Sequence, residues 1–203
     1  MDKSAKRDLD FLFEIGSLRN VPRGWKQHLG IDCASVLEHT LRVVWLALII
    51  ARREKGADEN KVLKMALVHD MSETRVSDLS YVQKVYVKAD ETMAIKDMFE
   101  GTMLEDFVDY FDEADKKESL EAKIVKDADN LDLDIEMSEL KNNGATVVGK
   151  WAEFRQALYE KKLYTETAKQ IWRELKAADP DNWHLTMNKW LKGKDQIIQN
   201  TLE

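Results

Sequence analysis

Residues 35–53 have the sequence SVLEHTLRVVWLALIIARR, and this segment is the most informative part of the chain for the fold. The Ser35 side chain can accept a hydrogen bond from the backbone N–H of Glu38, while the Glu38 carboxylate reaches back to Ser35. This reciprocal capping box is typical of a helix start. From Leu41 to Ile50 the segment is apolar almost all round, which predicts a central helix that is buried on every side.

Most other segments have the same helical periodicity. We expect further helices at about 9–16, 58–68, 89–98, 103–110, 118–140, 146–162, 165–177 and 181–199, with irregular chain at 19–34 and 76–87. Only two prolines and eight glycines occur in 203 residues, too few for the many turns of an all-β fold. The prediction is an all-α protein, a single domain over residues 1–203 with eight or more helices. Four aromatic side chains are expected in its core: Trp45, Trp151, Phe154 and Trp172.

Charge and composition exclude several functional classes. The chain has 31 Lys and Arg against 38 Asp and Glu, a net charge of −7, which argues against a nucleic-acid surface. Its longest uncharged run, residues 43–51, is far shorter than the ~18–20 residues of a membrane-spanning helix. A single cysteine, Cys33, rules out an intramolecular disulfide framework. With no signal-like segment at the start, a cytoplasmic location is expected.

Three polar positions interrupt apolar helix faces. His39 lies on the stripe of the central helix that also holds Val36 and Val43, His69-Asp70 ends an apolar helix, and Asp129 lies in the apolar face of a later one. Taken singly, they also fit a hydrogen-bonded core histidine, a charged helix end and a buried salt bridge. Together, two imidazoles and two carboxylates form a mixed nitrogen and oxygen set that suits one divalent transition metal, and the cation would satisfy both buried acids.

Two further acids follow the second histidine. Glu73 comes four residues after His69, so on a continuing helix it shares the face of that histidine and could orient a water molecule or accept its proton. Asp78 lies in the irregular segment around Ser77, where functional side chains often project. The alternative for both is a solvated surface acid.

These segments, in this order, resemble the HD-domain metal phosphohydrolase superfamily. Residues 35–39 are similar to its S-V-x-[ED]-H segment, residues 65–73 to A-L-x-H-D-x-x-E, and residues 125–131 to V-K-x-x-D-x-L. Asp78 stands five residues after Glu73, as in that family. The loop around residues 21–25, VPRGW, resembles the 5′-deoxynucleotidase branch. The resemblance covers roughly residues 9–140.

The resemblance implies a metal-dependent phosphohydrolase that converts deoxyribonucleoside 5′-monophosphates to deoxyribonucleosides and phosphate. It assigns one divalent ion per chain (Mn²⁺, Co²⁺, Ni²⁺, Fe²⁺ or Zn²⁺) to His39, His69, Asp70 and Asp129. It also assigns the catalytic acids to Glu73 and Asp78. The candidates for phosphate and sugar binding are Arg19, Arg23, Trp25 and Lys84.

Other readings stay open. Ser77 replaces a glycine common in the family, and residues 79–83 lack its usual prolines, which puts the substrate in question. One alternative is an HD-type enzyme for nucleoside triphosphates or cyclic nucleotides, and another is a non-catalytic helical metal-binding regulator. The helices at 146–201 pack on the core or form a homodimer interface, given the apolar residues Trp183, Leu185, Met187, Trp190 and Leu191. The only other partner expected is a small nucleotide, with no nucleic-acid polymer and no membrane.

Overall fold

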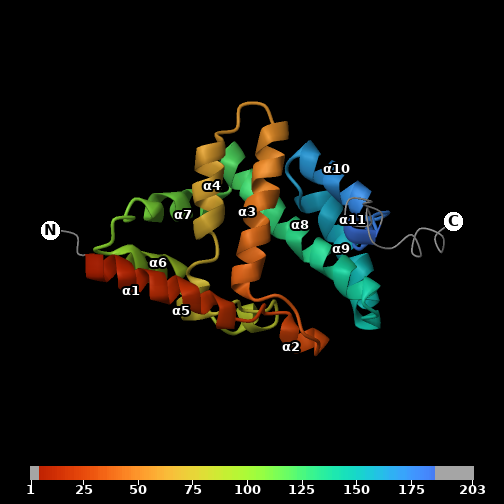
Figure 1. Cartoon of the computed structure of the whole chain (residues 1–203), viewed down its shortest axis with the longest axis horizontal. Helices are drawn as coiled ribbons and strands as arrows, with labels where there is room; N and C mark the ends of the chain where they lie inside the picture. The colour runs from red at the N-terminus through yellow and green to blue at the C-terminus, as the bar shows by residue number, and fades with distance from the viewer. Residues whose placement is uncertain (1–4, 186–203) are drawn as a thin grey trace, which may run out of the picture.

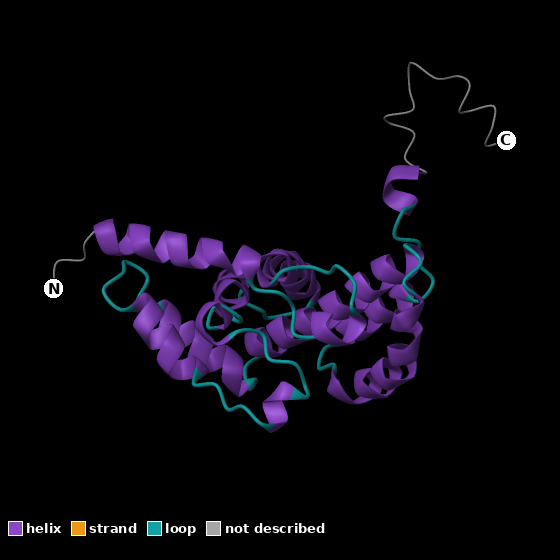
Figure 2. Cartoon of the chain, turned by 90° about the horizontal axis from the view of Figure 1, so that it is seen from below, coloured by secondary structure: helices purple, strands orange, loops and turns teal. Residues whose placement is uncertain are grey.

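The computed structural model describes residues 5–185, the side chains of residues 153, 157, 158 and 160 excepted. The regular elements within this range are helical, as predicted (Figures 1 and 2). The described residues also contain an isolated antiparallel β-bridge between Pro22 and Ser35. The α-helices are α1 (Ala5–Gly16), α2 (Lys26–Leu29), α3 (Val36–Arg53), α4 (Glu59–Val68), α5 (Glu73–Val76), α6 (Glu91–Phe99), α7 (Phe107–Lys116), α8 (Leu120–Asn142), α9 (Gly149–Lys162), α10 (Glu166–Leu175) and α11 (Asn182–Leu185). Short 3₁₀ turns are η1 (Ser17–Asn20), η2 (Gln83–Val85) and η3 (Thr146–Val148).

Helix α3 lies at the centre and packs against α4 and α8. Its capping box is confirmed, because Glu38 N donates to Ser35 Oγ at 3.3 Å and Ser35 N donates to Glu38 Oε2 at 2.7 Å. The inward face of α3 is buried, with Val43 0% exposed and His39 1% exposed. The histidine is thereby fixed in the core of the helix bundle.

The outward face of α3 contradicts the prediction that this helix is buried on every side. Leu41 and Trp45 are each 62% exposed, and Ile49 is 47% exposed. Phe154 on α9, also expected in the core, is 67% exposed, whereas Trp172 is buried as predicted. Apolar periodicity shows which residues a helix could bury, but the number of packed neighbours decides how many of its faces are covered.

The core is continuous from α3, α4 and α8 to the C-terminal helices. Tyr159 on α9 stacks on Trp172 of α10, with ring centroids 3.5 Å apart, and both belong to the same cluster as Val62 and Ile124. The short helix expected at 103–110 is instead α7, which begins at Phe107. The last helix expected from the sequence spans 181–199, and α11 corresponds to its start. The rest of that segment, with Met187, Trp190 and Leu191, lies outside the described residues.

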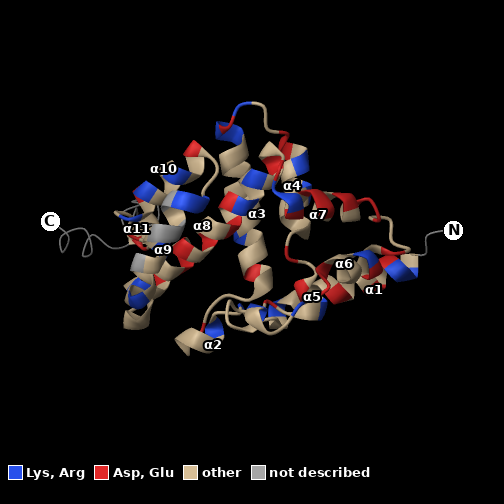
Figure 3. Cartoon of the chain, turned by 180° about the vertical axis from the view of Figure 1, so that it is seen from behind, with Lys and Arg blue, Asp and Glu red and all other residues tan. Residues whose placement is uncertain are grey.

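Two features of the surface bear on function. Acidic residues gather along α7, as Figure 3 shows, and this helix forms one side of the cavity described below. Within residues 5–185, none of the helices has the length and apolar character needed to cross a membrane.

Candidate metal centre

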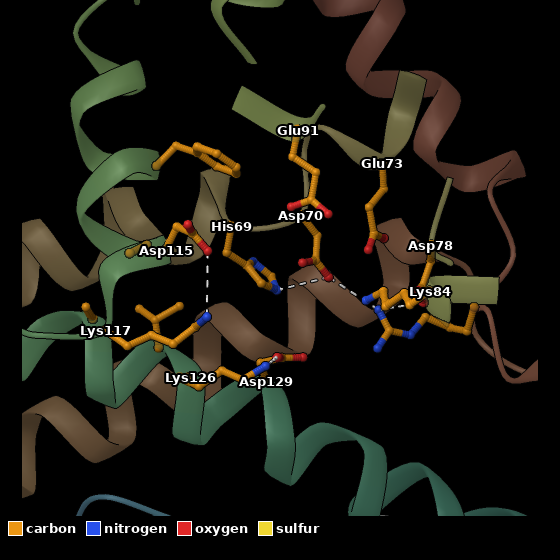
Figure 4. A pocket seen from close by; sticks show the side chains of 15 residues that line it. His69, Asp70, Glu73, Asp78, Lys84, Glu91, Asp115, Lys117, Lys126 and Asp129 are labelled. Atoms are coloured by element: carbon orange, nitrogen blue, oxygen red, sulfur yellow. Dashed lines mark hydrogen bonds and ion pairs between the residues drawn. The ribbon is translucent and has the colours of Figure 1, made fainter. Parts of the chain in front are cut away.

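Four side chains from three helices meet at one point beside a cavity, and Figure 4 shows three of them, His69, Asp70 and Asp129. His39 comes from the second turn of α3, His69 caps the C-terminal end of α4, Asp70 follows it, and Asp129 projects from α8. One donor atom from each of the four lies within 4.8 Å of the others. The structure thus brings together all four residues that the sequence predicted as ligands.

The spacing of these donor atoms fits a single cation. His39 Nε2 lies 3.2 Å from Asp70 Oδ2 and 3.3 Å from Asp129 Oδ1, and His69 Nε2 lies 3.3 Å from Asp70 Oδ2. Adjacent ligands that each bond one ion at about 2.1 Å lie about 3.0–3.4 Å apart, depending on the coordination geometry. Two imidazole nitrogens and two carboxylates at these distances therefore suit a divalent transition metal.

The outer nitrogen of each histidine is held by a separate partner. His39 Nδ1 lies 2.6 Å from Asp132 Oδ2, and His69 Nδ1 lies 2.8 Å from the carbonyl oxygen of Ala66. A donor hydrogen at Nδ1 leaves Nε2 free to bind a cation, which is the usual arrangement of metal-bound histidines. Asp132, only 2% exposed, also forms an ion pair with Arg42, whose Nε lies 3.2 Å from Asp132 Oδ1.

Sequence reasoning missed Asp132. The signal was present, because Asp132 comes three residues after Asp129 and so lies on the same side of α8. It is masked by the many acids of this helix, which carries Asp127, Asp134 and Glu136 as well.

The charges of the cluster are mutually dependent. Burial by itself lowers the pKa of His39, but contacts with Asp129, Asp132 and Asp70 raise it well above its usual value. Burial by itself raises the pKa of Asp70, yet the two histidines lower it well below its usual value. Positive charge is thus required between these carboxylates, and a divalent cation would supply it in place of a proton.

Arg23 connects the cluster to Asp78. Its Nη1 lies 3.3 Å from Asp70 Oδ2 and 3.4 Å from Asp78 Oδ2, and its side chain is almost completely buried. The neighbouring Gly24 donates its backbone N–H to Asp78 Oδ2 at 3.0 Å. A Cβ on Gly24 would lie 2.5 Å from the backbone oxygen of Asp78, so only glycine permits this close approach.

The turn before Asp78 is strained. Ser77 has φ 63° and ψ 157°, a combination that is essentially restricted to glycine. This conformation is a physical reason for a glycine at this position, and Ser77 adopts it at a cost in backbone strain. The strained turn aims Asp78 at Arg23 and the cavity.

Glu73 has a buried carboxylate oxygen, Oε2, for which the structure provides no hydrogen-bond partner. Burial and the nearby carboxylates of Asp70 and Asp78 raise the pKa of Glu73 well above its usual value. It lines the same cavity as His69 (Figure 4). A buried unpaired oxygen at this place is the feature expected of a group that binds water or substrate.

The cavity has a volume of about 340 Å³ and is lined by groups of both charges. That volume falls within the range of small-molecule sites. Its basic side chains are Arg23, Lys84, Lys117 and Lys126, and its acidic side chains beyond the metal cluster are Glu73, Asp78, Glu91 and Asp115. Sequence reasoning did not assign Lys117, Lys126, Glu91 or Asp115 to the site, and it expected Lys117 on a solvated face, because charged residues are frequent in these segments.

Two predicted substrate contacts lie elsewhere. Arg19 does not line the cavity, and its Nε donates to the carbonyl oxygen of Gly16 at 2.8 Å. Trp25 is only 7% exposed and packs edge-on against Trp151, with ring centroids 6.3 Å apart. The structure therefore favours Arg23 over Arg19 at the cavity and makes Trp25 an anchor of its loop.

Comparison with known proteins defines the class. The family model described as "HD domain" matches residues 15–178, and the chain belongs to this family. Within it, the chain lies in the branch of the 5′-deoxynucleotidases. It is 30% identical over 138 residues to the 5′-deoxynucleotidase HDDC2 of Danio rerio, covering 64% of this chain and 68% of that protein.

A second curated relative and a solved structure are also similar to this chain. The 5′-deoxynucleotidase YGK1 of Saccharomyces cerevisiae is 30% identical over 154 residues, covering 67% of this chain and 68% of that protein. Among solved structures, a conserved hypothetical protein from Pyrococcus furiosus superposes with a TM-score of 0.71 and 29% identity, covering 84% of this chain and 99% of that chain.

Proposed function

We propose that this protein is a metal-dependent 5′-deoxynucleotidase, a hydrolase that releases phosphate from deoxyribonucleoside 5′-monophosphates. The observation that carries this function is the meeting of His39, His69, Asp70 and Asp129 beside a cavity that also holds Arg23. The curated relatives with this HD domain are named 5′-deoxynucleotidases, which supports the substrate class.

His39, His69, Asp70 and Asp129 would hold one divalent ion, with Mn²⁺, Co²⁺, Ni²⁺, Fe²⁺ and Zn²⁺ all compatible with their donor atoms. Such an ion polarises a phosphoryl oxygen and lowers the pKa of bound water. Asp132 and the carbonyl oxygen of Ala66 keep the two imidazoles in the orientation that this role requires.

The other residues of the cavity would bind the phosphate, activate the water and contact the sugar or leaving group. Arg23 offers a planar guanidinium to the phosphate oxygens, and its contact with Asp70 keeps it beside the metal cluster. Lys84 adds a second positive charge at the wall of the cavity. Glu73 orients the attacking water or accepts its proton, and Asp78 faces the sugar or the leaving oxygen.

The direct test is phosphate release by metal-stripped protein after the divalent ions are added back singly. We expect metal-dependent release from deoxyribonucleoside 5′-monophosphates and weak release from the ribonucleotides. Phosphate release only from triphosphates or cyclic nucleotides would assign the protein to another class of HD-type enzyme. Stoichiometric metal binding without release from any nucleotide would favour the non-catalytic regulator.

A matched pair of variants tests the arginine assignment. Arg23→Ala should raise KM and lower kcat, because the guanidinium lies at the metal cluster. Arg19→Ala should leave both unchanged, because Arg19 bonds only to Gly16 in its own turn among the contacts described. Equal losses from both substitutions would contradict the assignment. Circular dichroism should verify that Arg23→Ala folds, since the substitution removes a buried guanidinium that contacts both Asp70 and Asp78.

We also propose that residues 1–203 form a single domain, since the continuous core links α3 and α8 to α10. A homodimer is proposed as well. The cytoplasmic location stays a prediction.

A further inference from the structure

Two of the candidate metal ligands are aspartates, and each has a basic side chain against its carboxylate. For Asp70 this is Arg23, whose Nη1 lies 3.3 Å from Asp70 Oδ2. The same oxygen lies 3.2 Å from His39 Nε2, so it is the oxygen that faces the other ligands. A cation at the cluster and the guanidinium of Arg23 would therefore compete for one oxygen of Asp70.

Asp129 instead divides its two oxygens between two partners. Its Oδ1 lies 3.3 Å from His39 Nε2, on the side of the other ligands. Its Oδ2 lies 2.6 Å from Lys126 Nζ, and Figure 4 shows the two side chains meeting. Lys126 can thus keep its contact while Oδ1 binds a cation, and this distinguishes it from Arg23.

Helix α8 fixes this arrangement. Lys126 comes three residues before Asp129, so the two side chains project from the same side of the helix. The flanking residues Val125 and Asp127 are 3% and 0% exposed, so rotation of α8 at this point would expose its core. Lys126 is partly buried and lines the cavity, where salt screens an ion pair less than on an open surface. The ammonium is thereby held against Asp129.

We propose that Lys126 is a positioning residue that makes Asp129 a metal ligand through one oxygen only. A carboxylate can bind a divalent ion through one oxygen or through both. Because Lys126 holds Oδ2, Asp129 offers Oδ1 alone to the cation. A ligand that occupies one coordination position instead of two leaves a further position for phosphate or water, which metal-assisted hydrolysis requires.

This inference rests on the proposed metal-dependent hydrolase, but part of its test does not need the reaction. The way in which Asp129 binds a metal ion is a property of the cluster, whatever the substrate. A protein that binds metal and releases phosphate from no nucleotide would contradict the proposed function. The metal affinity and the absorption spectrum described next would still decide the role of Lys126.

Lys126→Met tests the role, because it keeps most of the side-chain length and removes the charge. Both oxygens of Asp129 are then available to the ion, and the repulsion between the ammonium and a divalent cation is lost. We expect the metal affinity measured by calorimetry to be unchanged or higher. We expect kcat to fall about 10–100-fold, the range typical of substitutions next to a metal ligand. The visible absorption of the Co²⁺ form without substrate should change, because it depends on the number and arrangement of the ligand atoms.

Two further variants serve as controls. Lys126→Arg keeps a positive charge beside Oδ2 and should recover part of kcat. Lys123→Met removes a lysine one turn earlier on α8 that does not line the cavity. It should leave the metal affinity, the Co²⁺ spectrum and kcat as in the wild type. Circular dichroism and urea unfolding of the metal-free variants should verify that each one folds.

Three results would overturn the proposal. An unchanged Co²⁺ spectrum of Lys126→Met would mean that Asp129 binds in the same way without its ion pair. A metal affinity lowered about tenfold or more would mean that Lys126 supports the ligand without limiting it to one oxygen. An unchanged kcat with a higher KM and a higher inhibition constant for inorganic phosphate would make Lys126 a phosphate-binding residue instead.

Discussion

Helix α8 carries two aspartates two residues apart, of which Asp127 is buried and Asp129 is partly exposed, and their carboxylates have different neighbours. Asp127 is 0% exposed, and its carboxylate accepts hydrogen bonds from the backbone N–H groups of Tyr164 and Thr165 at 2.9 and 2.8 Å and from Thr165 Oγ1 at 2.8 Å. Asp129 instead faces the cavity, where Oδ1 lies 3.3 Å from His39 Nε2. Asp127 ties the start of α10 to the core, whereas Asp129 belongs to the metal cluster.

The pKa values of the two carboxyl groups move in opposite directions. Burial raises the pKa of Asp127 in spite of its three hydrogen bonds, all of which come from uncharged donors. Burial acts on Asp129 in the same sense, but Lys126 and His39 outweigh it and lower its pKa well below the usual value. The comparison shows that the neighbours met by each side of a helix decide whether the pKa of an aspartate rises or falls on folding.

The largest effect expected is from Asp129→Ala. Loss of a ligand should lower metal affinity by more than the 10–100-fold typical of an outer-shell substitution and reduce phosphate release to that of metal-free protein. The free energy of unfolding of the metal-free protein should fall less than in Asp127→Ala, because removal of Asp129 loses the contact with Lys126 but also relieves its repulsion with Asp70. Metal titration by calorimetry and urea unfolding measure the two quantities. Full metal content in the variant would show that Asp129 is not a ligand.

Asp127→Ala should give the reverse pattern. It leaves the backbone N–H groups of Tyr164 and Thr165 without this acceptor, and the buried N–H of Thr165 alone costs about 1–3 kcal/mol. Urea unfolding should show this loss, while the metal bound per folded molecule stays as in the wild type. A variant with wild-type stability would mean that the contact between α8 and residues 164–165 does not hold the C-terminal helices in place.

A third aspartate of α8, Asp132, tests a residue that positions a candidate ligand without being one. Asp132→Ala removes the partner of His39 Nδ1 but no ligand, so metal affinity should fall about 10–100-fold. Asp132→Asn keeps an acceptor for the Nδ1 hydrogen and should recover part of the loss. The visible absorption spectrum of the Co²⁺ form should shift in the alanine variant if the imidazole reorients. An unchanged affinity and spectrum would leave Asp132 with a purely structural role.

The smallest effect expected is a pH dependence due to Asp127. Its folded pKa lies above the usual value of 3.8, so the unfolded chain loses this proton first as pH rises. The stabilisation is therefore complete below about pH 3.8. It declines as pH rises through the raised pKa, by at most about 1.4 kcal/mol per pH unit.

Asp127→Asn has no proton to lose at this position and isolates the effect. The stability difference, wild type minus variant, should shrink as pH rises above about 4 in metal-free protein. Urea unfolding at matched pH measures it. A difference that grows with pH would contradict the raised pKa.

Sequence reasoning found Asp129 but not Asp127 or Asp132, for a physical reason. Asp129 lies in a motif and interrupts an apolar stripe, so a spacing rule reveals it. Asp127 is distinguished from a solvated acid by contacts such as that with Thr165, 38 residues away in the sequence. Asp132 is distinguished by contacts such as that with His39, 93 residues away. No local pattern encodes such contacts. The same limit explains why Arg19, Arg23 and Trp25 could not be distinguished before the loop was placed.

The sequence by itself determined the all-α class, the capping box that starts α3, and the identity of the four residues that cluster, because caps, periodicity and motif spacing are local properties of the chain. Tertiary structure alone decided which side of each helix is covered. It buried His39 and left Trp45 exposed on one apolar helix, and it brought Arg23 to Asp70. Burial and charge pairing depend on neighbours supplied by distant segments, and their positions exist only once the helices have packed.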